Sequence, residues 1–591
     1  MKKYYKYIIL LIMVLVSFTT VNVDAAIGYT YSHSGQPIYS SVGLSVTSDG
    51  IYTVISDAWI NEEGDRLPAN LFKSPEDLFV YTEKDENGKP TQDVIYVVDS
   101  QSNNLFVFDE NLNYKTRLDK FEVRPEKVTE EQILAAKTTV VEYDSDGGVR
   151  TTSSITYSDY LASKGYTIAQ FFALAEKDYE DRDEDEKFYI AANGLYGVYR
   201  AVRPVRDERG FIVRGEFQDV IYLCDMSGGQ IIIIDAETYV VEQIVTRPTD
   251  ISFAGKDFRP IKLVTDSTGM MFVISDGVYE GIMQMNYAGE FSSYIGVNYV
   301  SLTFWQIFQR RFMTEEQLKQ QQAILNTIFT SIAIDKEEFI YTTSRAINDT
   351  DDNAMIKRIN PAGKDVLTRN GYHVPKGDLV YIRTGPDASV RGPSRFSSIT
   401  VNDYGVYTVA DAKTGRLFTY DDEGNLLYIS AGKGNELTNL NNPVAIRYQG
   451  ENILALDKAR QAILRYEPTE IAKVINKATK YHYDGNLVAA SEEWNNVVAL
   501  NPNYEYAYVG IGKSLLNEER YEEAMQYFQI GYNVHYYSRA YKLYRDDLIR
   551  EYFTAFISAV LVLGVGLYGF KKYRDYKRKK LNPDEVGELD D

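Results

Sequence analysis

The sequence predicts a mainly β protein, a six-bladed β-propeller with helical insertions, followed by a module of paired helices and one C-terminal transmembrane helix. Three observations lead to this prediction. Apolar strand pairs separated by an aspartate recur along most of the chain, the pattern then changes to a helical period, and an uncharged stretch near the C-terminus precedes a cluster of Lys and Arg. A chain of 591 residues is too long for one compact core, so several modules are expected.

Composition limits the classes of partner. The net charge of −21 argues against extended contact with phosphates, because such contact depends on Lys and Arg. We therefore expect no nucleic acid partner. The single cysteine, Cys224, lies in an apolar strand, which is typical of a small buried thiol, and it leaves no partner for an intrachain disulfide.

The first residues, 1–25, have the pattern of a secretory signal peptide. Three lysines among the first six residues precede an apolar run from Ile8 to Phe18, and Val23 and Ala25 supply the small or branched residues that a signal peptidase reads. An uncleaved anchor is the alternative, but this run falls short of the ~20 residues that span a bilayer. The signal peptide predicts export of the rest of the chain.

The stretch "DVIYVVDSQSNNLFVFD", residues 93–109, recurs without gaps as "DVIYLCDMSGGQIIIID", residues 219–235. In each copy an apolar residue follows the central acid by six positions and another Asp follows it by ten. The same spacing fits three further segments, and the aligned acids are Asp99, Asp225, Asp276, Asp411 and Asp457. A sixth copy at 338–363 keeps both strands around a longer hairpin, and residues 50–60 resemble a first strand with its acid.

The repeat length favours a propeller. Asp225 and Asp276 are 51 residues apart, and Asp411 and Asp457 are 46 apart. Periods of ~45 residues made of short strands and turns are typical of four-stranded blades, each of which buries both faces against its neighbours. An Asp at the strand end can accept backbone N–H groups in the following turn, so we assign these acids a structural role rather than a catalytic one.

The hairpins "YVVDSQSNNLFVFDENLN" and "YTVADAKTGRLFTYDDEGN" resemble those of the NHL-repeat family. The resemblance covers roughly residues 40–470, within a propeller domain that we place at 27–468. It implies a six-bladed ring used for binding protein, glycan or nucleic acid, with only a few enzymatic members.

Two stretches, 121–190 and 302–325, interrupt the repeat with helical sequence. Both contain Thr-x-x-Gln capping boxes, which mark helix N-termini. The three boxes are Thr129/Gln132, Thr167/Gln170 and Thr314/Gln317. Long insertions occupy the rim of a propeller, so we expect them to shape a binding face. The acidic run at 176–187 indicates a solvated helix end rather than a cation site.

Residues 469–551 have a helical period and resemble the tetratricopeptide repeat (TPR) family over about 65 residues. Tyr508, Gly512, Ala524 and Phe528 have the spacing of that motif's aromatic, small, Ala and Phe positions, and Pro502 ends the preceding helix pair. Two repeats are expected, the first less typical, with a further helix from about Tyr536. Because two repeats leave an open face, a partner or the propeller must cover it.

Residues 552–570 predict a transmembrane helix, and 571–591 a cytoplasmic tail. Eighteen residues without a charge are followed by seven Lys or Arg among the next ten. Positive flanks stay in the cytoplasm, so the domains before the span are predicted to be extracytoplasmic. Tyr552, Tyr568 and Tyr573 suit the two membrane interfaces. Export without disulfides and a content of 49 Tyr associate the chain with a Gram-positive bacterial cell membrane.

No catalytic motif stands out. None of the four histidines forms a metal-binding pair, and no nucleophile elbow or phosphate-binding glycine loop occurs in the right context. Asp349, Asp351 and Asn353 are candidates for a calcium loop, but Ala354 and Asn360 stand where Gly and Glu are required. A polar hairpin tip is the favoured interpretation, and no cofactor is expected unless Ca²⁺ binds.

The leading hypothesis is a membrane-anchored scaffold. Its propeller rim would bind a glycan or protein ligand, and its TPR-like module would dock a membrane partner such as a transporter complex. The alternative is a calcium-dependent lactonase of the gluconolactonase-like propeller type, which requires three or four carboxylates converging on the ring axis. A structural spacer is a third interpretation.

Overall fold

The computed structural model describes most of the chain, in two compact units that meet between Asn476 and Lys477. The described residues are 27–31, 37–45, 51–53, 72–85, 87–143, 149–207, 209–250, 253, 256–296, 327–345, 355–369, 375–378, 381–382, 390–391, 393–434 and 436–581. Three predictions therefore lie outside them: the signal peptide, the insertion at 302–325 with its capping box, and the calcium candidates Asp349, Asp351 and Asn353.

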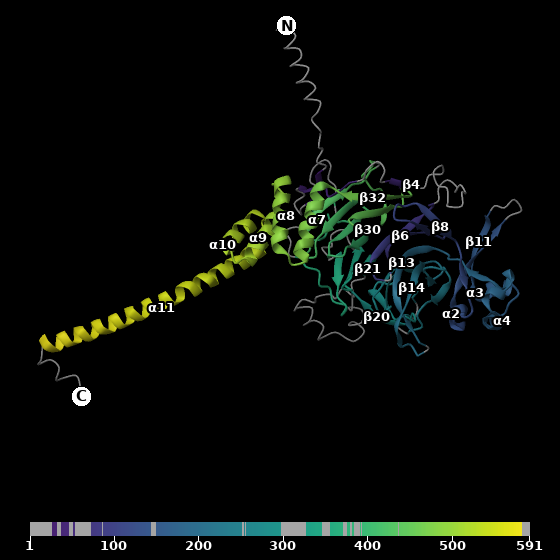
Figure 1. Ribbon diagram of the computed structural model, residues 1–591, viewed down its shortest axis with the longest axis horizontal. Helices are drawn as coiled ribbons and strands as arrows, with labels where there is room; N and C mark the ends of the chain where they lie inside the picture. The colour runs from purple at the N-terminus through teal and green to yellow at the C-terminus, as the bar shows by residue number, and fades with distance from the viewer. Residues whose placement is uncertain are drawn as a thin grey trace, which may run out of the picture. The chain divides into compact units, whose positions relative to one another are not determined.

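The first unit is a six-bladed β-propeller, as predicted (Figure 1). Within each blade, the three or four strands named below pair antiparallel in chain order. Blade one consists of β5 (Pro75–Lys84), β6 (Pro90–Asp99), β7 (Asn104–Phe108) and β8 (Tyr114–Leu118). Blade two contains β13 (Leu195–Arg206), β14 (Ile212–Asp225), β15 (Gln230–Asp235) and β16 (Val241–Val245). Blade three consists of β17 (Pro260–Thr265), β18 (Met271–Ser275), β19 (Ile282–Met285) and β20 (Phe291–Ile295).

Blade four contains β21 (Ile328–Ile334), β22 (Ile340–Arg345) and β23 (Ile356–Ile359). Blade five consists of β26 (Phe396–Val401), β27 (Tyr407–Asp411), β28 (Arg416–Tyr420) and β29 (Leu426–Ala431). Blade six contains β30 (Pro443–Gln449), β31 (Asn452–Asp457) and β32 (Ala462–Pro468). The first strands contact one another in the closed order β5, β13, β17, β21, β26, β30 and back to β5. We call these six the inner strands, because a closed circle of neighbours places them around the ring axis.

The N-terminal segment closes the ring. β4 (Ile51–Thr53) pairs antiparallel with β32, with Thr53 opposite Ala462, and β3 (Leu44–Ser45) also pairs with β32. The first stretch of the chain therefore supplies outer strands to the last blade. Of the predicted strand at 50–60, the structure describes residues 51–53, which form an outer strand of the last blade. The remainder of that segment lies outside the described residues.

The blades are held together by apolar side chains. Strands such as β7 and β18 are buried along their whole length because each sheet lies between two others. One cluster joins Ile95 and Phe106 of the first blade to Leu454 and Ile463 of the sixth, which seals the ring across its closing point.

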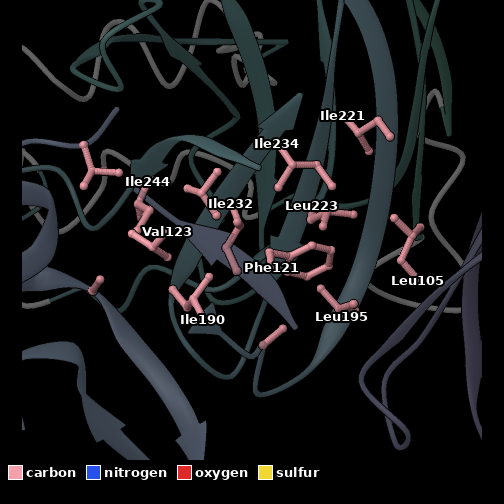
Figure 2. Close-up of a cluster of buried hydrophobic side chains, with 14 of the residues drawn as sticks. Leu105, Phe121, Val123, Ile190, Leu195, Ile221, Leu223, Ile232, Ile234 and Ile244 are labelled. Carbon is pink, nitrogen blue, oxygen red and sulfur yellow. The ribbon is translucent and has the colours of Figure 1, made fainter. Parts of the chain in front are cut away.

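The insertion at 121–190 is only partly helical, which corrects the prediction. Its helices are α2 (Glu130–Ala135), α3 (Tyr157–Ser163) and α4 (Ile168–Ala173), and its strands are β9 (Phe121–Val123), β10 (Lys137–Tyr143), β11 (Val149–Thr156) and β12 (Phe188–Ile190). The capping boxes of Thr129 and Thr167 are confirmed. β9 and β12 extend the second blade to six strands, because their apolar residues pack on its sheet, as Figure 2 shows for Phe121, Val123 and Ile190.

The described chain also contains two small strand pairs, β1 (Ile27–Tyr31) with β2 (Pro37–Ser41), and β24 (Tyr381–Ile382) with β25 (Val390–Arg391). The acidic run at 176–187 forms short 3₁₀ turns rather than a helix end. Its charges form ion pairs: Arg182 is buried and lies 3.0 Å from Glu126, earlier in the same insertion, and Lys177 lies 2.5 Å from Glu186.

The second unit consists of helices and begins within α7. The helices are α7 (Glu470–Tyr483), α8 (Leu487–Leu500), α9 (Glu505–Asn517), α10 (Tyr521–Ile530) and α11 (Val534–Leu581). Consecutive helices from α8 to α11 pack on one another. Two glycines of α9 allow this approach, because a Cβ atom on Gly510 would lie 2.3 Å from Trp494 and one on Gly512 would lie 2.7 Å from Phe528.

α11 is one continuous helix of 48 residues, ~70 Å long at 1.5 Å per residue (Figure 1). It includes the predicted span at 552–570. By length and composition it is apolar enough to cross a membrane, with a mean hydropathy of 2.0 over an 18-residue window. The helix is therefore compatible with a single-pass membrane anchor.

Candidate binding site

Asp99 ends β6 and is completely buried. Its Oδ2 accepts hydrogen bonds from the backbone N–H groups of Lys73 and Ser74, both at 2.7 Å. Its Oδ1 accepts from Gln101 and Ser102 at 3.0 and 2.8 Å. One carboxylate thus joins the loop entering the blade to the hairpin that follows β6.

Three other repeat acids make equivalent contacts. Asp225, Asp411 and Asp457 each end a second strand, are fully buried, and accept one or two N–H groups from the incoming loop and at least one from the hairpin. Burial raises the pKa of Asp225, and the hydrogen bonds that it accepts from Gly228 and the Gln230 side chain oppose that change. Because backbone N–H groups donate to their oxygens, these carboxylates hold the loops of the blade together, which is a structural role.

Asp276 does not occupy the equivalent position, which corrects the sequence alignment. The register pairs Pro260 with Ser275, just as it pairs Pro75 with Asp99. The Ser275 hydroxyl accepts from the Arg259 N–H at 2.9 Å, and the Asp276 side chain is 48% exposed. In the register, Asp99 lies opposite Asn104, five positions later, whereas the pairing of Met271 with Met285 places Ser275 opposite a residue six positions later. This one extra residue moved a match of fixed spacing by one position.

Each inner strand carries a bulge beside the end of its partner strand. The register shifts by one residue in all six blades, and the extra residues are Glu76, Tyr196, Ile261, Thr330, Ser397 and Val444. All six line one cavity of about 320 Å³. A bulge changes the direction of its extra side chain relative to the strand ladder. Because all six inner strands have a bulge at equivalent positions, the six extra residues surround a cavity at one end of the ring axis.

Side chains of residues just after the bulges accept hydrogen bonds from backbone N–H groups at the unpaired edges of the inner strands. Val198 N donates to Asp77 Oδ2 at 3.4 Å, Ile399 N donates to Ser331 Oγ at 3.3 Å, and Ile446 N donates to Ser398 Oγ at 3.0 Å. An inner strand has no further strand to pair with, so side chains of the preceding blade accept its N–H groups.

Lys262 brings a charge to the cavity from β17. Its side chain is 9% exposed, and its Nζ donates to Asp77 Oδ1 at 3.0 Å and to the Val444 carbonyl at 3.3 Å. Burial lowers the pKa of Lys262, Asp77 opposes that change, and Arg447, 3.8 Å from Asp77, adds to it. The Asp77 carboxylate, which lies between two cations, therefore links blades of the ring and has a structural role.

The other lining residues mix apolar and polar groups. The complete lining is Glu76, Tyr196, Met226, Ile261, Lys262, Ser275, Asp276, Gly277, Val278, Tyr279, Ile328, Phe329, Thr330, Arg345, Ser397 and Val444. Glu76 is held by Lys458 at 2.5 Å and by the Ser100 hydroxyl at 2.8 Å. A cavity with apolar walls and a few placed charges is typical of a small-molecule binding site.

The described residues do not supply the carboxylate cluster that the lactonase alternative requires. Within the ranges given above, no group of three or more His, Cys, Asp or Glu side chains could hold a metal. At the axis, Glu76, Asp77 and Asp276 each pair with a cation, Lys458, Lys262 and Arg259 respectively. Calcium needs six or more oxygen ligands, several of them usually carboxylates, and these residues do not fit that set.

The predicted residues of the helical module lie on α9, α10 and the turn before α9. Ala524 and Phe528 are completely buried, and the Tyr508 hydroxyl donates to the Pro502 carbonyl at 2.9 Å. Sequence reasoning missed the bulge residues, Lys262 and Arg345. Glu, Tyr, Ile, Thr, Ser and Val share no chemical property, so only the strand register could have aligned them.

The similarities found to known proteins are to solved structures, at low sequence identity and low TM-score. No family model matches the sequence. No curated protein sequence matches it. The chain is similar to virginiamycin B lyase from Staphylococcus aureus, at 10% identity over 66% of this chain and 94% of that one, with a TM-score of 0.31.

Two other solved structures illustrate the range of neighbours. Hydrazine synthase from Kuenenia stuttgartiensis aligns at 9% identity over 68% of this chain and 97% of that one, with a TM-score of 0.30. The allergen Mala s 1 from Malassezia sympodialis aligns at 9% identity over 67% and 92%, with a TM-score of 0.28. Neighbours of such different kinds assign no activity to this chain.

Proposed function

We propose that this protein is a membrane-anchored, extracytoplasmic binding protein. Its propeller, built from NHL-like repeats, holds a small ligand such as a sugar in the axial cavity, and its TPR-like helices dock a membrane partner such as a transporter. The observation that carries the proposal is the cavity itself, to which all six bulges contribute. A cavity of about 320 Å³ suits a small solute better than a protein surface.

Exposed apolar side chains on the helical unit support the docking role. Val488, Leu500 and Ile530 are 62, 57 and 50% exposed on α8 and α10, and Tyr532, in the turn after α10, is 63% exposed. Contiguous apolar exposure marks protein interaction sites in soluble domains, and Ile530 and Tyr532 lie only two positions apart in the chain. The seven Lys or Arg after residue 570 support an orientation with the tail in the cytoplasm.

The test is co-purification of the tagged full-length chain from its native membrane in mild detergent. We expect a membrane protein to be recovered in stoichiometric amount with the wild-type chain. The double variant Ile530→Asp, Tyr532→Asp should lose it, because burying a new carboxylate in an interface is costly. Phe211→Asp, at a propeller residue that is 69% exposed, is the matched control and should keep the partner. Equal recovery with all three chains would remove the docking half of the proposal.

A further inference from the structure

Among the described residues, no carboxylate balances one of the positive charges that line the axial cavity. Of its four charged lining residues, Glu76 pairs with Lys458 at 2.5 Å, Lys262 with Asp77 at 3.0 Å, and Asp276 with Arg259 at 3.4 Å. Arg345 ends β22 and its side chain is exposed. Within the described part of the chain no ion pair involves Arg345, so an acidic protein of net charge −21 keeps an unpaired guanidinium here.

Lys262 retains hydrogen-bonding capacity toward the same cavity. A protonated ammonium has three N–H donors, and two of them are directed to Asp77 Oδ1 and to the Val444 carbonyl. The third has no acceptor among the described residues. Because the side chain is more than nine-tenths buried and lines the cavity, a molecule bound in the cavity can supply that acceptor.

The walls suit a ring that carries hydroxyl groups. Tyr196, Tyr279 and Phe329 supply aromatic side chains, and Thr330 and Ser397 supply hydroxyls. A sugar presents apolar C–H faces for aromatic rings and hydroxyls for polar partners, so it uses both kinds of wall.

We propose that the cavity binds a carboxylated sugar, with its carboxylate paired to Arg345 and one of its oxygens accepting a hydrogen bond from Lys262. The inference rests on the proposed binding function and deepens it by naming the ligand class. Guanidinium and carboxylate groups match in a planar, two-bonded geometry, and such charge-assisted pairs are among the stronger hydrogen bonds in proteins.

The experiment is calorimetric titration of the detergent-solubilised full-length chain. The probes are galacturonate and glucuronate, their neutral counterparts galactose and glucose, and a short galacturonate oligomer. We expect an acidic sugar to bind at least roughly tenfold more tightly than its neutral counterpart, which is the effect of one charged hydrogen bond. Tighter binding of the oligomer would identify a polymer end as the source, and equal binding would identify the free monosaccharide.

Two variants separate the roles of charge and wall. Arg345→Gln should weaken binding of the acidic sugars by roughly tenfold to a hundredfold and leave the neutral sugars unchanged. Tyr279→Ala, at a side chain that is 40% exposed, should weaken both classes. Arg209→Gln is the matched control, because it makes the same charge change in the β13–β14 turn, at the other end of β13 from the cavity-lining residue Tyr196.

Each outcome decides something. The proposal is supported if Arg345→Gln binds the acidic sugars more weakly than wild type and Arg209→Gln does not. Equal affinity for acidic and neutral sugars, unchanged in Arg345→Gln, overturns the carboxylate inference and leaves the binding function standing. No binding of any of the five probes at millimolar concentration overturns the sugar site in both proposals, while the co-purification test still judges the docking role separately.

Discussion

At the scale of single residues, the acids of the repeat divide into two kinds. Asp99, Asp225, Asp411 and Asp457 are fully buried and occupied by backbone donors, whereas Asp276 is half exposed beside the cavity. Identical letters in an alignment therefore have different physical roles. The distinction depends on one position of register at the end of β18.

The two kinds of acid predict different costs of substitution. Asp99→Ala should lower the free energy of unfolding of the propeller by roughly 2–4 kcal/mol, because it leaves four backbone N–H groups without their acceptor. Asp276→Ala is the matched control and should change it by less than about 0.5 kcal/mol. Denaturant unfolding followed by near-ultraviolet circular dichroism measures both. Similar losses in the two variants would contradict the assignment by register.

Lys357 on β23 predicts a pH dependence. Burial lowers the pKa of this lysine to about 8, although Asp365 opposes the change, and its Nζ donates to the Gly296 carbonyl at 2.6 Å. The unfolded chain keeps a pKa of about 10.4, so between these values the unfolded state binds more protons and stability rises with pH. Below pH 8 the cost of the buried charge is fully present.

The comparison is with Lys357→Met, which keeps the apolar stem. The variant's stability advantage over wild type should shrink by roughly 2–4 kcal/mol between pH 7 and pH 10.5, as wild type loses its penalty. Tyrosine ionisation affects both chains alike and cancels in the difference. Denaturant unfolding at several pH values gives the two profiles, and parallel profiles would show that Lys357 titrates normally.

At the scale of elements, small residues decide how closely the C-terminal helices approach. Gly510→Ala should destabilise the helical unit by roughly 1–2 kcal/mol: the new methyl group would overlap the buried Trp494 ring, which outweighs the gain of about 1 kcal/mol in helix propensity. Gly564→Ala, also in a helix but with no atom within 4 Å of the new methyl, should not destabilise. Thermal loss of the 222 nm signal reports both, and equal midpoints would mean that Trp494 can move away.

The sequence was sufficient to predict most of the strands and helices, but it was insufficient to predict the cavity. Strand pairs, the helix caps at Thr129 and Thr167 and the apolar part of α11 follow from local patterns, so they could be predicted. The cavity could not, because bulge residues such as Glu76 and Thr330 share only a position in a register. The β10–β11 hairpin was missed because the capping boxes on either side of it suggested a continuous helical insertion.

At the scale of the whole molecule, the pairing of β3 and β4 with β32 helps to close the ring. Thr53 on β4 lies opposite Ala462 on β32, and Cα atoms of antiparallel partners, about 4.5–5.5 Å apart, are within the range that a disulfide bridges. The double variant Thr53→Cys, Ala462→Cys should form this bond on oxidation and raise the midpoint of thermal unfolding by several degrees relative to the same chain reduced. Failure of the two thiols to join, judged by gel mobility against each single-cysteine variant, would contradict the closing pair.

The pairing of β4 with β32 also constrains the order in which the molecule can be made. Translation delivers β4 early, yet its partner emerges only some four hundred residues later. At about 5–20 residues per second, the ribosome needs roughly 20–80 seconds to supply it. During that interval the nascent chain must keep an unmatched strand away from its own later blades and from neighbouring polypeptides. The last step of biogenesis, rather than the first, therefore creates a closed domain, and truncated chains that stop before β32 should be the ones that quality-control proteases recognise.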